Sequence, residues 1–195
     1  ATTTHQELYE RREDYGPSPD GGYTVPADVL VVTAFVDVQM DRLEVTFLGW
    51  GANDEKWVLD HRVHYCDTTD PDAWDKFDAA VLSITFAHPT GATIGIEAIG
   101  IDAGFRQVRV LQFVTERRAA YRPFYAVKGV DGPGRPLWRE SQQKFQRGAK
   151  LYLSGVDDGK SMLYRELAVR TDDEERRPRV HFPRHLEAAY FEERV

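Results

Sequence analysis

The feature that most constrains this chain is an apolar segment, residues 30–39, that carries a single carboxylate near its end. The segment reads LVVTAFVDVQ, and β-branched and aromatic residues of this kind favour a strand. A second apolar segment, residues 43–50, follows a short polar turn, so the two predict a β-hairpin. Because side chains alternate along a strand, Asp37 shares one face with Thr33 and Phe35, whereas the other face is almost wholly apolar. A charge on so apolar a strand is costly to bury without a partner or a metal ion, so Asp37 is the first candidate for chemistry.

Length and composition limit the kind of protein this can be. A chain of 195 residues with 42% hydrophobic residues is long enough for one well-filled domain. The single cysteine, Cys66, excludes an intrachain disulfide and a thiolate-rich metal site, which fits a reducing compartment. No apolar segment reaches membrane-spanning length, so no membrane association is expected. The net charge of −7 argues against a wholly basic nucleic-acid coat and leaves room for a local basic patch.

The order of the remaining patterns predicts an α/β domain. Residues 1–28 are polar and predict an N-terminal arm or linker with a short helix, and residues 29–195 predict the domain itself. Further strands are predicted at residues 56–65, 93–102, 124–128, 151–156 and 179–183, and helices at residues 73–86, at 107–118 and from 157 onward. A strand, a helix and a strand in succession indicate a parallel crossover beside the antiparallel hairpin.

A second aspartate, Asp102, lies at the carboxyl end of the strand predicted at residues 93–102, a place that matches that of Asp37 near the end of its own strand. Sites in open α/β sheets form at the carboxyl ends of strands, so the two carboxylates would converge if their strands are neighbours. Their mutual repulsion would be relieved by a hard divalent cation, and oxygen ligands suit one or two Mg²⁺ or Mn²⁺ ions. The small residues Ala98, Gly100 and Gly104 would let a bulky substrate approach. The alternative is that either aspartate only caps a strand end or a turn.

Other acidic residues and the histidines are weaker candidates. Asp157 and its neighbour Asp158 follow another strand and open a helix, so either a third ligand or a helix cap fits them. Glu97 alternates to the face opposite Asp102, and Asp41 and Glu44, in or after the hairpin turn, are expected to be solvated. His61 and His64 alternate to opposite faces of their strand and so cannot share a ligand role.

A basic stretch lies between residues 128 and 150. It holds six cations against Asp131 and Glu140, a local excess of four positive charges, with Trp138 and Phe145 interleaved: Lys128, Arg135, Arg139, Lys144, Arg147 and Lys150. Cations in a loop of this length could contact a phosphate backbone, or the loop could simply be solvated. Lys128, at a strand end, could also stabilise charge that develops on a phosphate.

Several motifs occur in this order and spacing: REDYG, VVTAFVDVQMDRLEVTFLGWG, EKWVLDHRV, AIGIDAG, YAVKGVDGPGRPLW, LYLSGVDDGKSMLY and VHFP. Together they resemble the nuclease domain of the large terminase subunit of tailed bacteriophages, in the lambda-type branch. The resemblance covers residues 10 to 183 and implies a ribonuclease-H-like fold and a metal-dependent endonuclease that cuts concatemeric double-stranded viral DNA. It places the first metal-binding acid of the family at Asp37 in VDVQ and the second at Asp102 in GIDAG.

The resemblance also has limits and further implications. The remaining acid of the family lies in a C-terminal helix reading roughly NEALD, which this chain lacks, and Asp157 matches a recurring family position without an assigned ligand role. No GxxxxGK[ST] phosphate-binding loop occurs, so we expect the nuclease portion alone. The implied partners are the terminase ATPase domain, the small terminase subunit and the portal, in the host cell cytoplasm. Rival hypotheses are a non-catalytic DNA-binding or motor-docking module, and another ribonuclease-H-like enzyme such as a resolvase or an RNA–DNA hybrid nuclease.

Overall fold

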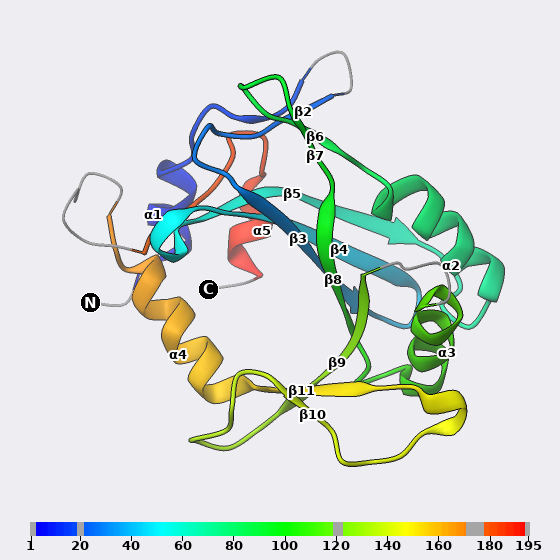
Figure 1. Ribbon diagram of the computed structural model, residues 1–195. Coiled ribbons are helices and arrows are strands. Elements are labelled where there is room, and N and C mark those ends of the chain that lie inside the picture. The colour runs from blue at the N-terminus through cyan, green and yellow to red at the C-terminus, as the bar shows by residue number, and fades with distance from the viewer. Residues whose placement is uncertain (1–2, 19–21, 119–122, 171–177, 194–195) are drawn as a thin grey trace.

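An eight-stranded mixed sheet forms the centre of the structure, a computed structural model that describes residues 3–18, 22–118, 123–170 and 178–193 (Figure 1). Its strands, in the order in which they lie side by side, are β10 (Arg139–Glu140), β11 (Leu151–Gly155), β9 (Phe124–Val130), β8 (Ile96–Asp102), β3 (Val31–Val38), β4 (Arg42–Trp50), β5 (Lys56–Tyr65) and β12 (Val180–His181). Strands β3, β4 and β5 are antiparallel neighbours, whereas β3, β8, β9 and β11 run parallel. The predicted hairpin, third strand and parallel crossover are therefore confirmed, and the protein is a mixed α/β domain.

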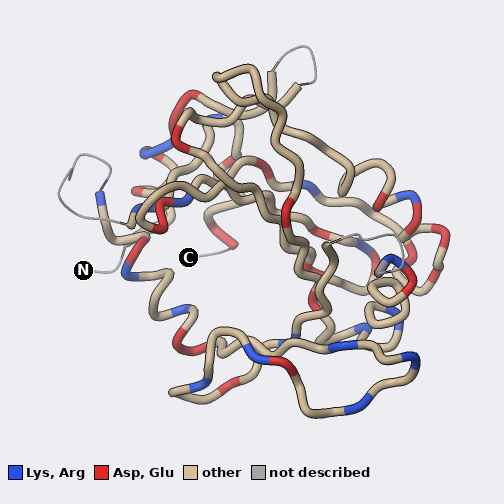
Figure 2. Tube along the Cα trace, in the orientation of Figure 1, with Lys and Arg blue, Asp and Glu red and all other residues tan. Residues whose placement is uncertain are grey.

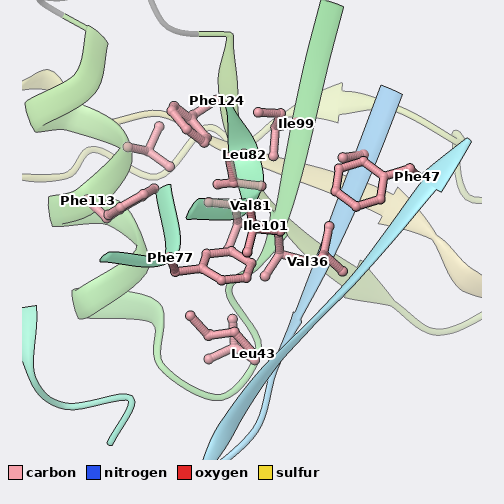
Figure 3. Packing of buried hydrophobic residues seen from close by; sticks show 14 of the residues in the cluster. Val36, Leu43, Phe47, Phe77, Val81, Leu82, Ile99, Ile101, Phe113 and Phe124 are labelled. Carbon is pink, nitrogen blue, oxygen red and sulfur yellow. The ribbon is translucent and has the colours of Figure 1, made fainter. Parts of the chain in front are cut away.

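One face of this sheet is the hydrophobic core. Alternation along β3 buries Val32, Ala34, Val36 and Val38 on this face, and Ile99 and Ile101 of β8 continue it. Helices α2 (Pro71–Phe77) and α3 (Gln107–Arg118) cover the face with large aromatic side chains, which pack against the strands in Figure 3. Full burial of each large apolar side chain contributes about 1.5–3 kcal/mol, so the packing of these helices on the sheet stabilises the fold.

The helix predicted at residues 73–86 is shorter than expected. Asp70 caps its start by accepting a hydrogen bond from the Asp72 backbone N–H at 3.0 Å, but α2 ends at Phe77 and a single π-helical turn, Asp78–Leu82, follows. Phe86 then belongs to strand β6 (Phe86–Ala87), where its ring packs on Phe47 at 5.7 Å. The prediction extended the helix to Phe86 because this buried residue of β6 lies four positions after Leu82, a spacing that also fits one face of a helix.

The strand predicted at residues 93–102 is two strands. Strand β7 (Thr93–Ile94) pairs with β6 in a small second sheet with β1 (Gly16–Pro17) and β2 (Tyr23–Thr24), whereas β8 begins after Gly95 and joins the main sheet. In the basic stretch, β9 continues to Val130, and β10 pairs antiparallel with β11. The sequence did not reveal the break at Gly95 because apolar residues continue on both sides of it, at Ile94 and Ile96.

The two chain ends pack on each other. Helix α1 (His5–Glu10) begins with a capping box between Thr4 and Glu7 and lies against α5 (Ala188–Glu192), where Leu8 and Phe191 are buried together (Figure 1). Arg11 donates hydrogen bonds to the backbone carbonyls of Leu167 and Val169, each at 2.7 Å. The N-terminal segment thus joins the C-terminal segment at the β5 edge of the sheet.

Candidate active site

The two candidate aspartates lie next to each other on the open face of the sheet. Strands β3 and β8 are parallel neighbours, and Val36 pairs with Ile101 in their ladder. Asp37 and Asp102 each follow that pair by one residue, and both side chains are half-buried on the face opposite the core. The sequence predicted that these carboxylates would converge if their strands were neighbours, and the register brings them together.

The surroundings of Asp102 raise the pKa of its carboxyl group above the ordinary value. Burial raises the pKa of Asp102, and the negative charge of Asp37 raises it further. A hydrogen bond from the Gly104 backbone N–H to Asp102 Oδ1, at 2.9 Å, and the positive charge of Lys128 act in the opposite direction without outweighing burial. Two carboxylates in this arrangement repel each other when both are ionised, and a cation between them would relieve that repulsion.

Asp37 has a second acidic neighbour, Glu44, that sequence reasoning undervalued. Glu44 lies directly opposite Asp37 in the β3–β4 register, and its side chain is only 12% exposed, so the expectation that it is solvated was wrong. Arg42 donates a hydrogen bond to Glu44 Oε1 at 2.7 Å, and His61 Nε2 lies 3.6 Å from Glu44 Oε2. Gln39 Nε2 donates to Asp37 Oδ2 at 2.6 Å. The hairpin register was the signal that could have identified Glu44, because opposite residues in antiparallel strands share a face.

The two histidines of β5 lie on opposite faces of the sheet, as predicted. His61 is within 3.0 Å of the Thr46 hydroxyl on the open face. His64 packs against the Phe77 ring on the core face, with 5.7 Å between ring centroids. They belong to different environments and share no ligand role.

The small residues beside Asp102 do not all leave room for substrate. A Cβ on Gly100 would lie 2.8 Å from Cδ2 of Phe35, so the Phe35 ring occupies the space that the glycine leaves. Gly104 serves a different purpose, because a Cβ there would lie 3.2 Å from the Asp102 carboxylate oxygen. The absence of a side chain at residue 104 lets the backbone donate its hydrogen bond to Asp102 without crowding.

Asp157 and Asp158 stand at the first turn of α4 (Val156–Leu167), which follows β11. Asp157 accepts a hydrogen bond from the Gly132 backbone N–H at 3.0 Å, and Asp158 accepts one from Gly134 at 2.9 Å. These carboxylates hold the loop that follows β9. Across the residues that the structure describes, no group of three or more His, Cys, Asp or Glu side chains is arranged to hold a metal ion.

The chemistry of the central pair fits a hard divalent cation. Asp37 and Asp102 offer carboxylate oxygens, the ligands that Mg²⁺ and Mn²⁺ prefer, from two rigid neighbouring strands. Asp37 accepts a hydrogen bond from Gln39 and Asp102 accepts one from the Gly104 backbone, and each carboxylate has further lone pairs for a cation. The pair could therefore contribute two of the ligands of such an ion.

Comparison with known proteins assigns the chain to a family. The family model described as "Terminase large subunit gpA, endonuclease domain" matches residues 1–195. The chain belongs to this terminase family. It is 27% identical to the terminase large subunit of Escherichia phage lambda over 177 residues. The matched segment covers 90% of this chain and 26% of the phage lambda protein. The chain is 26% identical over 140 residues to the terminase large subunit of Enterobacteria phage P21, or 72% of this chain and 22% of the other.

The terminase-family chain thus spans about a quarter of the length of the curated relatives it matches. No solved structure matches it. The resemblance to the lambda-type large terminase subunit that the motifs indicated is confirmed by the family model and by both relatives. None of the helices in the described ranges is long and apolar enough to cross a membrane.

The six basic residues of the predicted patch are all exposed and lie along the β9–β11 side of this terminase-family domain. In Figure 2 several Lys and Arg positions recur along the trace of this lower loop. Lys150 forms an ion pair with Glu140 at 2.9 Å, and Lys128 is close enough to affect the pKa of Asp102. The patch therefore begins beside the carboxylate pair and continues outward along the loop.

Proposed function

We propose that this chain is the metal-dependent endodeoxyribonuclease domain of a DNA-packaging terminase, built on a ribonuclease-H-like fold, and that it cuts concatemeric double-stranded DNA. The observation that carries the proposal is the pair Asp37 and Asp102 on neighbouring parallel strands of a chain in a terminase endonuclease family. The antiparallel order β3, β4, β5 followed by parallel β8 and β9 supports the fold assignment.

Asp37 and Asp102 would hold one or two Mg²⁺ or Mn²⁺ ions. When bound, such ions activate a water molecule and stabilise the leaving 3′ oxygen of a phosphodiester. The protein's own groups prepare the site: Gln39 orients Asp37, and the Gly104 N–H orients Asp102. Lys128, beside Asp102, supplies positive charge where a phosphate would enter.

The basic residues support binding of a duplex. Contacts to phosphates are independent of base sequence and give affinity through release of counterions. The residues proposed for this role are Lys128, Arg135, Arg139, Lys144, Arg147 and Lys150. We further propose, from the family, that this domain works in the host cell cytoplasm with a terminase ATPase domain, a small terminase subunit and a portal.

A non-catalytic DNA-binding or motor-docking module is the second candidate. It is favoured by the finding that the described residues contain no cluster of three metal-binding side chains, because two aspartates hold a cation less firmly than three or four acids. Titration of Mn²⁺ into the chain, followed by calorimetry and plasmid nicking, separates the two, since a docking module gives neither heat of binding nor nicks. Comparing duplex DNA with an RNA–DNA hybrid as substrate tests the other ribonuclease-H-like activities.

The direct test of the nuclease is Asp37→Asn. This variant keeps the side-chain size but removes one negative ligand, so we expect plasmid cleavage in Mn²⁺ to be lost while the circular dichroism spectrum is unchanged. Glu97→Gln, an exposed acid of β8, is the matched control and should cleave like the wild type. Full activity in Asp37→Asn would refute the assignment.

A further inference from the structure

A groove of about 560 Å³ opens on the same sheet face as the carboxylate pair. Residues of five strands and of the loop after β9 line it, among them Thr33, Phe35, Trp50, Gly100, Tyr125 and Trp138. Phe35 and Gly100 each precede an aspartate of the pair by two residues, and side chains two apart on a strand are about 7 Å apart on one face. The groove is thus adjacent to the place where the scissile phosphate would bind.

The wall of the groove farthest from β4 is an aromatic platform. The rings of Trp138 and Tyr152 stack with centroids 4.7 Å apart and planes at 19°, and Tyr125 meets both edge-on, at 5.9 and 5.6 Å. Trp138 nevertheless remains 52% exposed, which is unusual for a side chain of its size. This ring has surface available for another flat group.

The platform is held in place from several sides. Asp157 and Asp158 accept hydrogen bonds from the backbone N–H groups of Gly132 and Gly134, in the loop that carries Trp138. The Gly155 N–H donates to the Pro136 carbonyl at 3.0 Å. A loop fixed in this way loses little conformational entropy when it binds a ligand.

Charge and polarity identify the kind of ligand. None of the described residues that line the groove is charged, whereas Arg135 and Arg139 flank Trp138 in the sequence and both are exposed. An uncharged aromatic groove beside a loop that also carries exposed cations fits a surface that stacks bases and holds the phosphates of an unpaired strand. The volume lies within the roughly 300–1,000 Å³ of small-molecule pockets, enough for a base and its sugar.

We propose that this groove binds one unpaired nucleobase of the strand whose phosphate meets Asp37 and Asp102, stacked on Trp138. The inference rests on the proposed nuclease function and adds to it that the DNA is locally unpaired beside the cut. A fully paired duplex presents no free base face to Trp138, so the groove distinguishes single-stranded from double-stranded segments.

The test measures binding of a single-stranded oligonucleotide that contains the fluorescent base 2-aminopurine, with a chelator present so that no cleavage contributes. We expect the wild type to bind it and quench its fluorescence, and Trp138→Ala to bind roughly ten-fold more weakly without quenching. Binding of a blunt duplex should change less than two-fold. Trp138→Phe should restore most of the affinity, and Tyr164→Ala, which removes a ring with the same 52% exposure on α4, should bind like the wild type.

Equal single-strand affinity and equal quenching in wild type and Trp138→Ala would overturn the groove proposal. An absence of single-strand binding in the wild type would also overturn it. Cleavage of a plasmid in Mn²⁺ is measured separately. If the wild type quenches 2-aminopurine but does not cleave the plasmid, the proposed nuclease function is refuted and base binding is not. If it cleaves the plasmid but does not quench 2-aminopurine, only the groove proposal is refuted.

Discussion

Carboxylates at two places in the sheet differ in whether cationic side chains of the protein neutralise them. At the β5–β12 edge, Glu55 is buried with a side-chain exposure of 3%, and Oε1 accepts hydrogen bonds from Arg179 at 2.9 Å and from His181 at 2.7 Å. At the centre, Asp37 and Asp102 face each other, and within the described ranges neither forms an ion pair with a cationic side chain.

The difference separates a carboxylate that is neutralised within the fold from two carboxylates that we propose bind an external cation. Burial of a carboxylate is tolerated where cations of the same chain neutralise it, as Arg179 and His181 do for Glu55. Two adjacent carboxylates without such a cation destabilise the protein unless one is protonated or an ion binds. We therefore expect stability and the proposed nuclease activity to depend on different residues, which can be changed independently.

The largest expected effect on stability comes from Glu55→Gln. Removing the charge leaves Arg179 and His181 buried beside a neutral amide, so the free energy of unfolding should fall by about 3 kcal/mol. Asp102→Asn, the matched change in the central pair, removes a repulsion, and the free energy of unfolding should stay within about 1 kcal/mol of the wild type. Urea denaturation of both variants measures this. A larger loss in Asp102→Asn than in Glu55→Gln would break the comparison.

The pH dependence of stability should originate at the β5–β12 edge. Burial lowers the pKa of His181, but hydrogen bonds to Glu13 and Glu55 outweigh burial, so the folded-state pKa is raised above the ordinary value. A raised pKa means that protonated His181 stabilises the fold fully below a pH of about 6.5 and loses this contribution as the pH rises through the folded-state pKa. The difference in unfolding free energy between wild type and His181→Gln should therefore shrink from pH of about 6 to about 9. A difference that is constant over this range would contradict it.

The basic patch should have a smaller effect, visible in the salt dependence of DNA binding. The double variant Lys144→Ala/Arg147→Ala removes two proposed phosphate contacts, so the slope of log K against log salt concentration should decrease in magnitude by about 1.8. Lys76→Ala/Arg184→Ala, which removes two exposed cations elsewhere, should leave the slope unchanged. Equal slopes in all three proteins would show that the loop is merely solvated.

Asp157→Asn should have the smallest effect and decides between two roles. If the carboxylate only holds the loop at Gly132, the variant loses one exposed hydrogen bond, worth about 1 kcal/mol, and cleavage in Mn²⁺ changes little. Loss of cleavage comparable to that in Asp37→Asn would instead make Asp157 a metal ligand. Plasmid nicking by Asp157→Asn beside Asp37→Asn makes the measurement.

Local patterns were sufficient for most elements. The strand β5 occupies Lys56–Tyr65 as the alternation predicted, and α3 begins at Gln107. The sequence pattern failed to show where one element ends and the next begins. It missed the break at Gly95 between β7 and β8, and it assigned Phe86 of β6 to the preceding helix. A pattern of apolar residues indicates which side chains are buried. It does not show whether a buried residue belongs to a helix, to a strand of the main sheet or to a second sheet.

The sequence by itself determined that Asp37 and Asp102 each lie near the carboxyl end of an apolar strand, because the pattern of apolar residues along one strand is a local property. Only the tertiary structure decided that these strands are neighbours and in register, and that the Phe35 ring fills the space at Gly100. It also decided that Asp157 holds a loop. These facts depend on pairing between residues distant in the chain, which no local spacing encodes.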